Sequence, residues 1–219
     1  MEDFNGIISL LVACIEIGLF VNLLIFAEKN CINKLAITLI GLLMTYQLLE
    51  FVMCFVELQT AMVVYLALFS ISLMPPLALF LVLRFNDIKS KAAFLIFIPA
   101  LYFVFYYLYY LDTIAVTKCT VMYAVYNYPL GVYYGTFYYL PILASIIFLA
   151  FKLNGEDDQA RKNLNIILLV GYVLTFFPGL IINLFVPGAF EFIESNLCKI
   201  AMIFAISHAL FVLKNRNIN

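Results

Sequence analysis

Seven long apolar stretches, separated by short polar segments, organise the whole chain. They cover residues 5–27, 35–56, 60–83, 92–111, 131–151, 164–185 and 189–212. An α-helix that rises ~1.5 Å per residue needs about 20 apolar residues to cross a hydrocarbon core ~30 Å thick. Continuous apolar runs of this kind favour helices over the alternating strands of a membrane β-barrel. The pattern predicts an all-α polytopic membrane protein, a single seven-transmembrane helix bundle over residues 1–219.

The basic residues predict how this bundle is oriented. Most of them follow the first, third, fifth and seventh stretches: Lys29, Lys34, Arg84, Lys89, Lys91, Lys152, Arg161, Lys162, Lys214 and Arg216. The other side carries the acidic start of the chain and a single Lys118. By the positive-inside rule we expect the N-terminus outside and the C-terminus in the cytoplasm. Residues 152–163 are then the largest inner break, expected to be a solvated connector.

Composition and motifs exclude several classes of function. The chain is 66% hydrophobic and 11% charged, a composition unlike that of a soluble domain. Its net charge of −1 gives no indication of nucleic-acid binding. It contains no Gly-rich phosphate loop, no HExxH and no GxSxG motif. The single histidine, His208, is expected to be an interfacial or packed residue. We therefore predict neither an enzyme nor a nucleic-acid-binding protein, and no cofactor or metal.

The outer segment 112–130 is the longest break between apolar stretches. Its Thr, Val and Tyr residues favour a small β-hairpin over the bundle. The five cysteines show no metal-binding or redox spacing. Cys119 lies in this segment and Cys54 lies near the outer end of the second stretch, so a disulfide between them is one pairing that the sequence leaves open.

Ionisable residues within or near the membrane spans are the first candidates for function. They are Glu16, Glu50, Glu191, Glu194 and Lys199. A charge at the bilayer centre costs roughly 2.5–3.5 kcal/mol on insertion scales, so these side chains should face the bundle interior. Glu16 and Lys199 both lie ~15 Å below the outer surface at the helical rise, whereas Glu194 is poorly placed to pair with Lys199 within one helix. We predict a Glu16–Lys199 bridge, either structural or acting as a ligand counter-charge or proton-coupled switch.

Most of the 15 tyrosines lie between residues 102 and 139. An interfacial belt accounts for part of this concentration, because Tyr favours the headgroup level. The tyrosines occupy consecutive positions that point all round their helices, so some must face inward. We predict a tyrosine-lined pocket, open to the outside between the fourth and fifth helices and their loop, for a small amphipathic or aromatic ligand. The residues expected to bind it are Tyr106, Tyr109, Tyr110, Tyr134, Tyr138 and Glu50.

Prolines interrupt four of the predicted helices at Pro75, Pro76, Pro99, Pro141 and Pro178. Each removes a backbone hydrogen bond and is expected to kink its helix, for static packing or for hinge motion.

An ordered set of motifs runs through the second and third stretches. In chain order they are Glu50, Tyr65, Ser72-Leu73-Met74-Pro75-Pro76-Leu77-Ala78-Leu79-Phe80 and Leu83-Arg84-Phe85. This order resembles the N-terminal seven-helix sensor region of bacterial histidine kinases, with further matches at Pro99, residues 131–139 and residues 213–218. The resemblance implies a receptor-like signalling module in the bacterial cytoplasmic membrane. Such a module binds a small ligand from the outer side or the bilayer and relays it through cytoplasmic loops to a partner protein.

No kinase domain follows within these residues, so we expect a stand-alone sensor or a piece of a longer protein. Loops 84–91 and 152–163 are expected to contact the partner. The alternative function is a small transporter or a substrate-binding subunit of a membrane transport complex, because seven helices suit a three-plus-one-plus-three plan. Helices one to three and five to seven share no recurring proline or polar pattern, which disfavours that plan. A structural subunit of a membrane complex is a third alternative.

Overall fold

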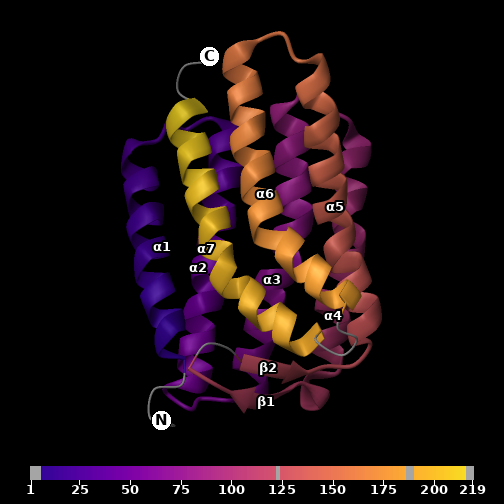
Figure 1. Cartoon of the computed structure of the whole chain (residues 1–219). Helices are drawn as coiled ribbons and strands as arrows, with labels where there is room; N and C mark the ends of the chain where they lie inside the picture. The colour runs from indigo at the N-terminus through magenta and orange to yellow at the C-terminus, as the bar shows by residue number, and fades with distance from the viewer. Residues whose placement is uncertain (1–5, 122–123, 186–189, 216–219) are drawn as a thin grey trace.

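Seven long helices run side by side in the computed structural model, and a small β-hairpin lies across one end of them (Figure 1). The structure describes residues 6–121, 124–185 and 190–215, without the side chains of residues 179–199. The helices are α1 (Ile7–Phe26), α2 (Cys31–Cys54), α3 (Ala61–Phe85), α4 (Ile98–Tyr109), α5 (Gly131–Gly155), α6 (Gln159–Phe185) and α7 (Phe190–Lys214). Two 3₁₀ helices, η2 (Lys91–Phe97) and η3 (Leu111–Thr113), flank α4. The strands are β1 (Ala115–Cys119) and β2 (Ala124–Asn127).

Membrane-length apolar helices make up most of this fold. Among the described residues, six helical segments are long and apolar enough to cross a bilayer, and Ile200–Lys214 of α7 forms a shorter apolar helix. The prediction of an all-α fold built from apolar helices is thereby confirmed. Such a protein is suited to a lipid bilayer, where every backbone polar group must be satisfied within the segment.

Several helices extend beyond the apolar runs that predicted them. The second helix begins at Cys31 and not near residue 35, because the side chain of Asn30 caps it by accepting a hydrogen bond from the Asn33 amide at 2.7 Å. The predicted connector 152–163 is mostly helical, since α5 continues to Gly155 and α6 begins at Gln159. Apolar runs mark only the part of a helix that fits the hydrocarbon core, and these helices continue with polar residues beyond it.

The helices form a ring, with α4 outside it. Around the ring α1 packs on α2, α2 on α3, α3 on α5, α5 on α6 and α6 on α7. Helix α7 closes the ring by packing against both α1 and α2. Helix α4 packs mainly against α3 and contributes little to the ring interior. A cavity inside the ring is therefore lined chiefly by helices other than α4.

The predicted hairpin is confirmed, and so is the disulfide that the sequence left open. Strands β1 and β2 pair antiparallel, with Ala115 opposite Asn127 and Cys119 opposite Ala124. A disulfide joins Cys119 of β1 to Cys54, the last residue of α2. The hairpin is therefore covalently tied to the bundle. We call this end of the molecule the hairpin end (bottom of Figure 1).

The opposite end carries most of the positive charge, and we call it the basic end (top of Figure 1). Here α1, α3, α5 and α7 terminate, and α2 and α6 begin. Its described basic residues are Lys29, Lys34, Arg84, Lys89, Lys91, Lys152, Arg161, Lys162 and Lys214.

Polar contacts tie together the chain segments at the basic end. Asn86, just after α3, and Asn165 of α6 exchange two amide hydrogen bonds of 3.2 and 3.3 Å, and both side chains are buried. Arg161 forms an ion pair with Asp87 at 2.8 Å. These contacts join the C-terminal end of α3 to the first half of α6.

Replacing Asn86 by Ala should lower the free energy of unfolding by about 1–3 kcal/mol, because the Asn165 amide is left buried without its partner. A denaturant titration in bicelles measures the loss. The matched control is Asn22→Ala, since the exposed Asn22 amide donates only to the Gly18 carbonyl of its own helix, at 2.7 Å. We expect a change below about 0.5 kcal/mol for the control. Equal losses in the two variants would show that the Asn86–Asn165 pair does not couple α3 to α6.

The predicted proline kinks divide into two groups. Pro75 and Pro76 lie inside α3, Pro141 inside α5 and Pro178 inside α6. Helix α6 bends in the half that leads to its C-terminal end (Figure 1). Pro99 was predicted inside the fourth helix, but it lies in the first turn of α4, directly after η2. A proline is tolerated in a first turn, so Pro99 marks a helix start and not an internal kink.

Candidate ligand cavity

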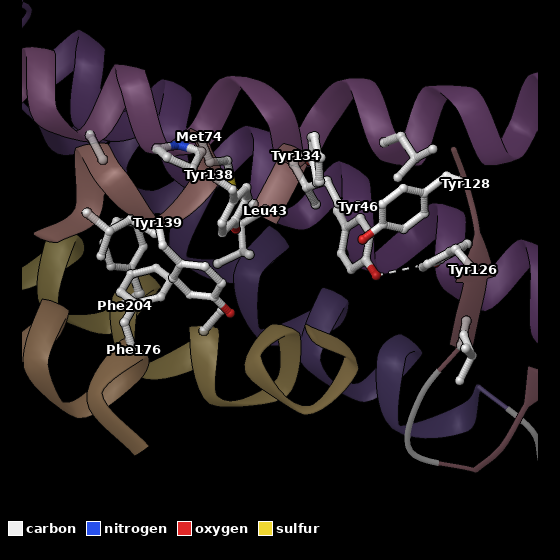
Figure 2. A pocket seen from close by; sticks show the side chains of 18 residues that line it. Leu43, Tyr46, Met74, Tyr126, Tyr128, Tyr134, Tyr138, Tyr139, Phe176 and Phe204 are labelled. Atoms are coloured by element: carbon white, nitrogen blue, oxygen red, sulfur yellow. Dashed lines mark hydrogen bonds between the residues drawn. The ribbon is translucent and has the colours of Figure 1, made fainter. Parts of the chain in front are cut away.

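A cavity of about 60 Å³ lies inside the ring, beneath the hairpin. Its walls come from α2, α3, α5, α6 and α7, and strand β2 lies over it at the hairpin end. Figure 2 shows tyrosine rings from several of these elements pointing into one space. The tyrosines that line it are Tyr46, Tyr126, Tyr128, Tyr134, Tyr138 and Tyr139. Leu43, Met74, Phe176 and Phe204 add apolar walls.

Tyrosine hydroxyls place polar groups among these rings. The Tyr46 hydroxyl on α2 and the Tyr126 hydroxyl on β2 share a hydrogen bond of 3.3 Å, shown dashed in Figure 2. Across the ring, the Tyr134 hydroxyl on α5 shares one of 3.0 Å with Ser72 on α3. A mostly apolar cavity with a few placed polar groups is typical of small-molecule sites. The two hydrogen bonds also link the hairpin to α2, and α3 to α5.

Ring packing holds Tyr134 firmly in place. Its ring meets those of Phe103, Tyr107 and Tyr128 at centroid distances of 5.3, 5.7 and 5.5 Å, each close to edge-to-face. Such pairs contribute about 0.5–1.5 kcal/mol each beyond the area they bury. Tyr134 thus forms a rigid wall, whereas Tyr138 and Tyr139 are only partly buried.

The hairpin covers the cavity at the hairpin end. Ala124, Val125 and Tyr126 of β2 belong to its lining. The partner strand β1 is held by the Cys54–Cys119 disulfide. Just beyond β1, the Thr120 carbonyl accepts a hydrogen bond of 3.0 Å from the Gly6 amide, before α1 begins. Access from this end therefore requires the hairpin to shift on its tethers.

The Pro-Pro step of α3 separates the cavity from a smaller neighbour. Pro75 lines the tyrosine cavity, whereas Pro76 lines a second cavity of about 20 Å³ between α3, α4 and α5. Tyr134 and Tyr138 line both spaces. Tyr138 therefore lies between the two spaces. The step where α3 lacks backbone hydrogen bonds lies directly at this boundary.

The cavity volume limits what enters without rearrangement. An apolar cavity of ~150 Å³ admits benzene, and a water molecule has a share of ~30 Å³ in the liquid. The cavity of about 60 Å³ therefore holds little more than water until side chains move. A ligand the size of one aromatic ring must displace a tyrosine ring, and Tyr138 has the second cavity beside it.

Only part of the predicted ligand set lies at this cavity. Tyr134 and Tyr138 line it, but Tyr109 is 82% exposed, Tyr110 is 41% exposed and Tyr106 is half-buried outside it. The larger cavity does not lie between the fourth and fifth helices, where the pocket was predicted, because α4 packs outside the ring. The smaller cavity of about 20 Å³ does lie there, and Tyr134 and Tyr138 line it too. The tyrosines at the end of α4 instead suit the interfacial belt. Glu50 is fully buried but does not line the cavity.

Tyr46, Phe176 and Phe204 also line the cavity but were not predicted from the sequence. Tyr46 precedes the tyrosine-rich segment, yet it lies one helical turn from Glu50 and near Leu43, on a face of α2 that is buried. A search for one buried face at helical spacing would have found it. Tyr126, Tyr128 and Tyr139 lie in the tyrosine-rich segment but were not among the residues predicted to bind the ligand.

The intramembrane carboxylates face inward, as predicted. Glu16 and Glu50 are both 0% exposed, and so are Ser9 and Gln47 beside them on α1 and α2. Helix α7 packs against both of these helices. The side chains of Glu191, Glu194 and Lys199 lie outside the described residues. The Glu16–Lys199 bridge therefore stays a prediction.

His208 is a packed residue of α7. Its side chain is buried, its Nδ1 atom lies 2.9 Å from the Phe204 carbonyl, and its ring lies 4.0 Å from the Phe204 ring. This packing agrees with the prediction of an interfacial or packed residue. Within the described part of the chain, no group of three or more His, Cys, Asp or Glu residues could hold a metal ion.

Comparison with family models, curated proteins and solved structures gave no match. The fold and cavity themselves define the class: a helical protein of membrane type whose bundle encloses a tyrosine-lined cavity beneath a disulfide-tethered hairpin.

Proposed function

We propose that this protein is a receptor-like membrane sensor that binds a small amphipathic or aromatic ligand in the tyrosine-lined cavity. The observation that carries the proposal is the cavity itself, where aromatic rings from α2, α5 and the hairpin surround hydroxyl groups. Aromatic walls favour a flat apolar ligand, and the hydroxyls favour one with a donor or acceptor at its edge. The motif resemblance to sensor regions of bacterial histidine kinases supports the same function.

The signal would leave the cavity through the helices that line it. Helix α3 contributes Met74 and Pro75, α6 contributes Phe176 and α7 contributes Phe204. At the basic end the Asn86–Asn165 and Asp87–Arg161 contacts join α3 to α6. A ligand that displaces a tyrosine and shifts α3 at its Pro-Pro step would therefore move the loops at the basic end. A partner protein would bind loops 84–91 and 152–163.

We infer that all seven helices span the membrane, with the N-terminus outside and the C-terminus in the cytoplasm of a bacterial cell. Two independent features support this orientation. The basic residues gather at one end, as the positive-inside rule requires of a cytoplasmic end. The Cys54–Cys119 disulfide lies at the other end, and disulfides persist in oxidising surroundings outside the cytoplasm.

Native mass spectrometry of gently extracted protein tests the binding site. The wild-type protein should carry a reproducible small added mass. Tyr46→Phe with Tyr126→Phe keeps the rings but removes the hydroxyl pair. A hydrogen bond from these hydroxyls to the ligand is worth about 0.5–1.5 kcal/mol. We therefore expect the double variant to bind the ligand about tenfold more weakly, which lowers the fraction of protein that carries the added mass.

The matched control is Tyr109→Phe with Tyr110→Phe, two exposed tyrosines outside the cavity. This control should retain the wild-type adduct. An adduct that both double variants lose equally, or that neither loses, would count against the cavity as its site. Substrate-dependent uptake by liposomes containing only this protein would instead favour the transport alternative.

A further inference from the structure

A third concavity lies between α1 and α2, towards the basic end, with a volume of about 600 Å³. Its walls are mainly apolar and come from Phe20, Leu23 and Leu24 of α1 and from Ile37 and Leu42 of α2. None of its lining residues belongs to the tyrosine cavity. We call it the α1–α2 groove. Leu24 is half exposed, so the groove opens on the outer surface of the bundle.

A glycine helps to keep the groove open. Gly41 of α2 belongs to its lining, and a Cβ atom at that position would lie 3.0 Å from the Phe20 ring. The polar wall residues present little free hydrogen-bonding capacity, because Thr38 and Thr45 donate to the Lys34 and Gly41 carbonyls of their own helix, each at 2.8 Å. Along its length the groove therefore offers methyl and methylene groups, which suit a hydrocarbon chain.

Charged groups surround the mouth of the groove. Lys29 and Lys34 belong to its lining and are exposed, on the connection from α1 and in the first turns of α2. Glu28 lies beside them, so the mouth carries a net positive charge. The two lysines stand where α1 ends and α2 begins, at the level of the other basic residues of this end.

The length of the groove matches one leaflet of a bilayer. From Lys34 to Thr45 along α2 the helical rise covers ~16 Å, about half of a hydrocarbon core ~30 Å thick. An apolar channel of that length, with cations at its mouth at the basic end, is complementary to one lipid acyl chain below a negatively charged headgroup. Basic pockets between transmembrane helices on the cytoplasmic side bind anionic headgroups in this way.

We propose that the α1–α2 groove binds an anionic phospholipid, with an acyl chain between Leu24 and Ile37 and the headgroup phosphate at Lys29 and Lys34. Any lipid covers the apolar walls, so the specific claim is selectivity for an anionic headgroup. The proposal is independent of the ligand in the tyrosine cavity, because the two sites share no residue.

The test compares binding of dioleoyl phosphatidylglycerol and dioleoyl phosphatidylcholine to the full chain by native mass spectrometry. We expect phosphatidylglycerol to bind more tightly. Lys29→Gln with Lys34→Gln should weaken it about 20-fold or more, at about fivefold per lysine, and should leave phosphatidylcholine unchanged. The matched control is Lys89→Gln with Lys91→Gln, two exposed lysines of the basic end outside the groove.

Two further variants keep the test decisive if the lysine variant folds poorly. Glu28→Gln removes the negative charge at the mouth and should strengthen phosphatidylglycerol binding several-fold. Gly41→Leu fills the groove and should weaken both lipids, whereas Gly18→Leu should not, because a Cβ atom at Gly18 meets nothing within 4 Å. The proposal is overturned if phosphatidylglycerol binds no better than phosphatidylcholine, or if the Lys29/Lys34 and Lys89/Lys91 variants weaken it equally.

Discussion

Replacing Cys54 and Cys119 together by serine is expected to lower the free energy of unfolding by about 2–4 kcal/mol, the usual range for a lost disulfide. The bond joins residues 65 positions apart and so closes a loop that contains α3, η2, α4 and most of β1. Without it the unfolded chain gains freedom, and in the folded protein β1 loses its covalent tie to α2. The loss should lie towards the lower end of the range, because helices inserted in a bilayer restrict the unfolded chain. Denaturant titration in bicelles measures it.

The same variant should also loosen the cover of the cavity. Strand β2 lines the cavity and pairs with the tethered strand β1, so protease should cut the hairpin faster and a bound ligand should leave faster. The matched control is Cys14→Ser with Cys31→Ser, two exposed free thiols outside the cavity. It should change stability by less than about 0.5 kcal/mol. If the two double variants had equal effects, the disulfide would not be what holds the hairpin over the cavity.

Gly171→Val should destabilise the protein by about 1–3 kcal/mol through overpacking where α6 meets α7. A Cβ atom at Gly171 would collide with the Ser207 Oγ atom and lie 2.5 Å from the Ser207 Cβ atom. The two helices cannot keep their separation with a side chain at that position. Since α7 closes the ring against α1 and α2, the strain should also reduce ligand retention. Thermal unfolding in detergent measures the change in stability.

Two companion variants separate this collision from a general effect of valine in a helix. Gly18→Val lies on α1, where a Cβ atom meets nothing within 4 Å, and should leave the unfolding temperature nearly unchanged. Adding Ser207→Gly to Gly171→Val removes the colliding atoms and should recover much of the loss. If Gly171→Val is no less stable than Gly18→Val, the close α6–α7 approach is not needed for the fold.

Some of this architecture follows from the sequence because single residues carry strong physical constraints. Burying an unpaired charge in lipid is costly, so Glu16 and Glu50 had to face the interior, and they do. The Thr- and Val-containing segment after α4 had the β-propensity for the hairpin that the structure contains. The ends of helices were harder to predict. The side chain of Asn30 caps the start of α2, and an apolar run gives no sign of such a cap.

The position of the cavity did not follow from the sequence, because it depends on which helices enclose the interior. Tyr109 and Tyr134 are the same residue type in the same tyrosine-rich segment, yet one is exposed and the other buried. The difference arises because α4 packs outside the ring while α5 belongs to it. Tyr46 reaches the same space from a distant part of the chain, through its hydrogen bond to Tyr126. The buried face of α2 is visible in the sequence, but the pairing of Tyr46 with a residue 80 positions away is not.

If occupancy of the tyrosine cavity is communicated to the basic end, removal of the ligand should change amide hydrogen exchange at both ends of the bundle. Amide exchange is compared between gently extracted protein that carries its bound mass and the same protein after the ligand is stripped. We expect faster exchange after stripping both in the hairpin and around residues 84–91 and 156–162, where α3 meets α6. Exchange that changes only in the hairpin, with the basic end unaffected, would contradict a sensor that relays its signal through the bundle.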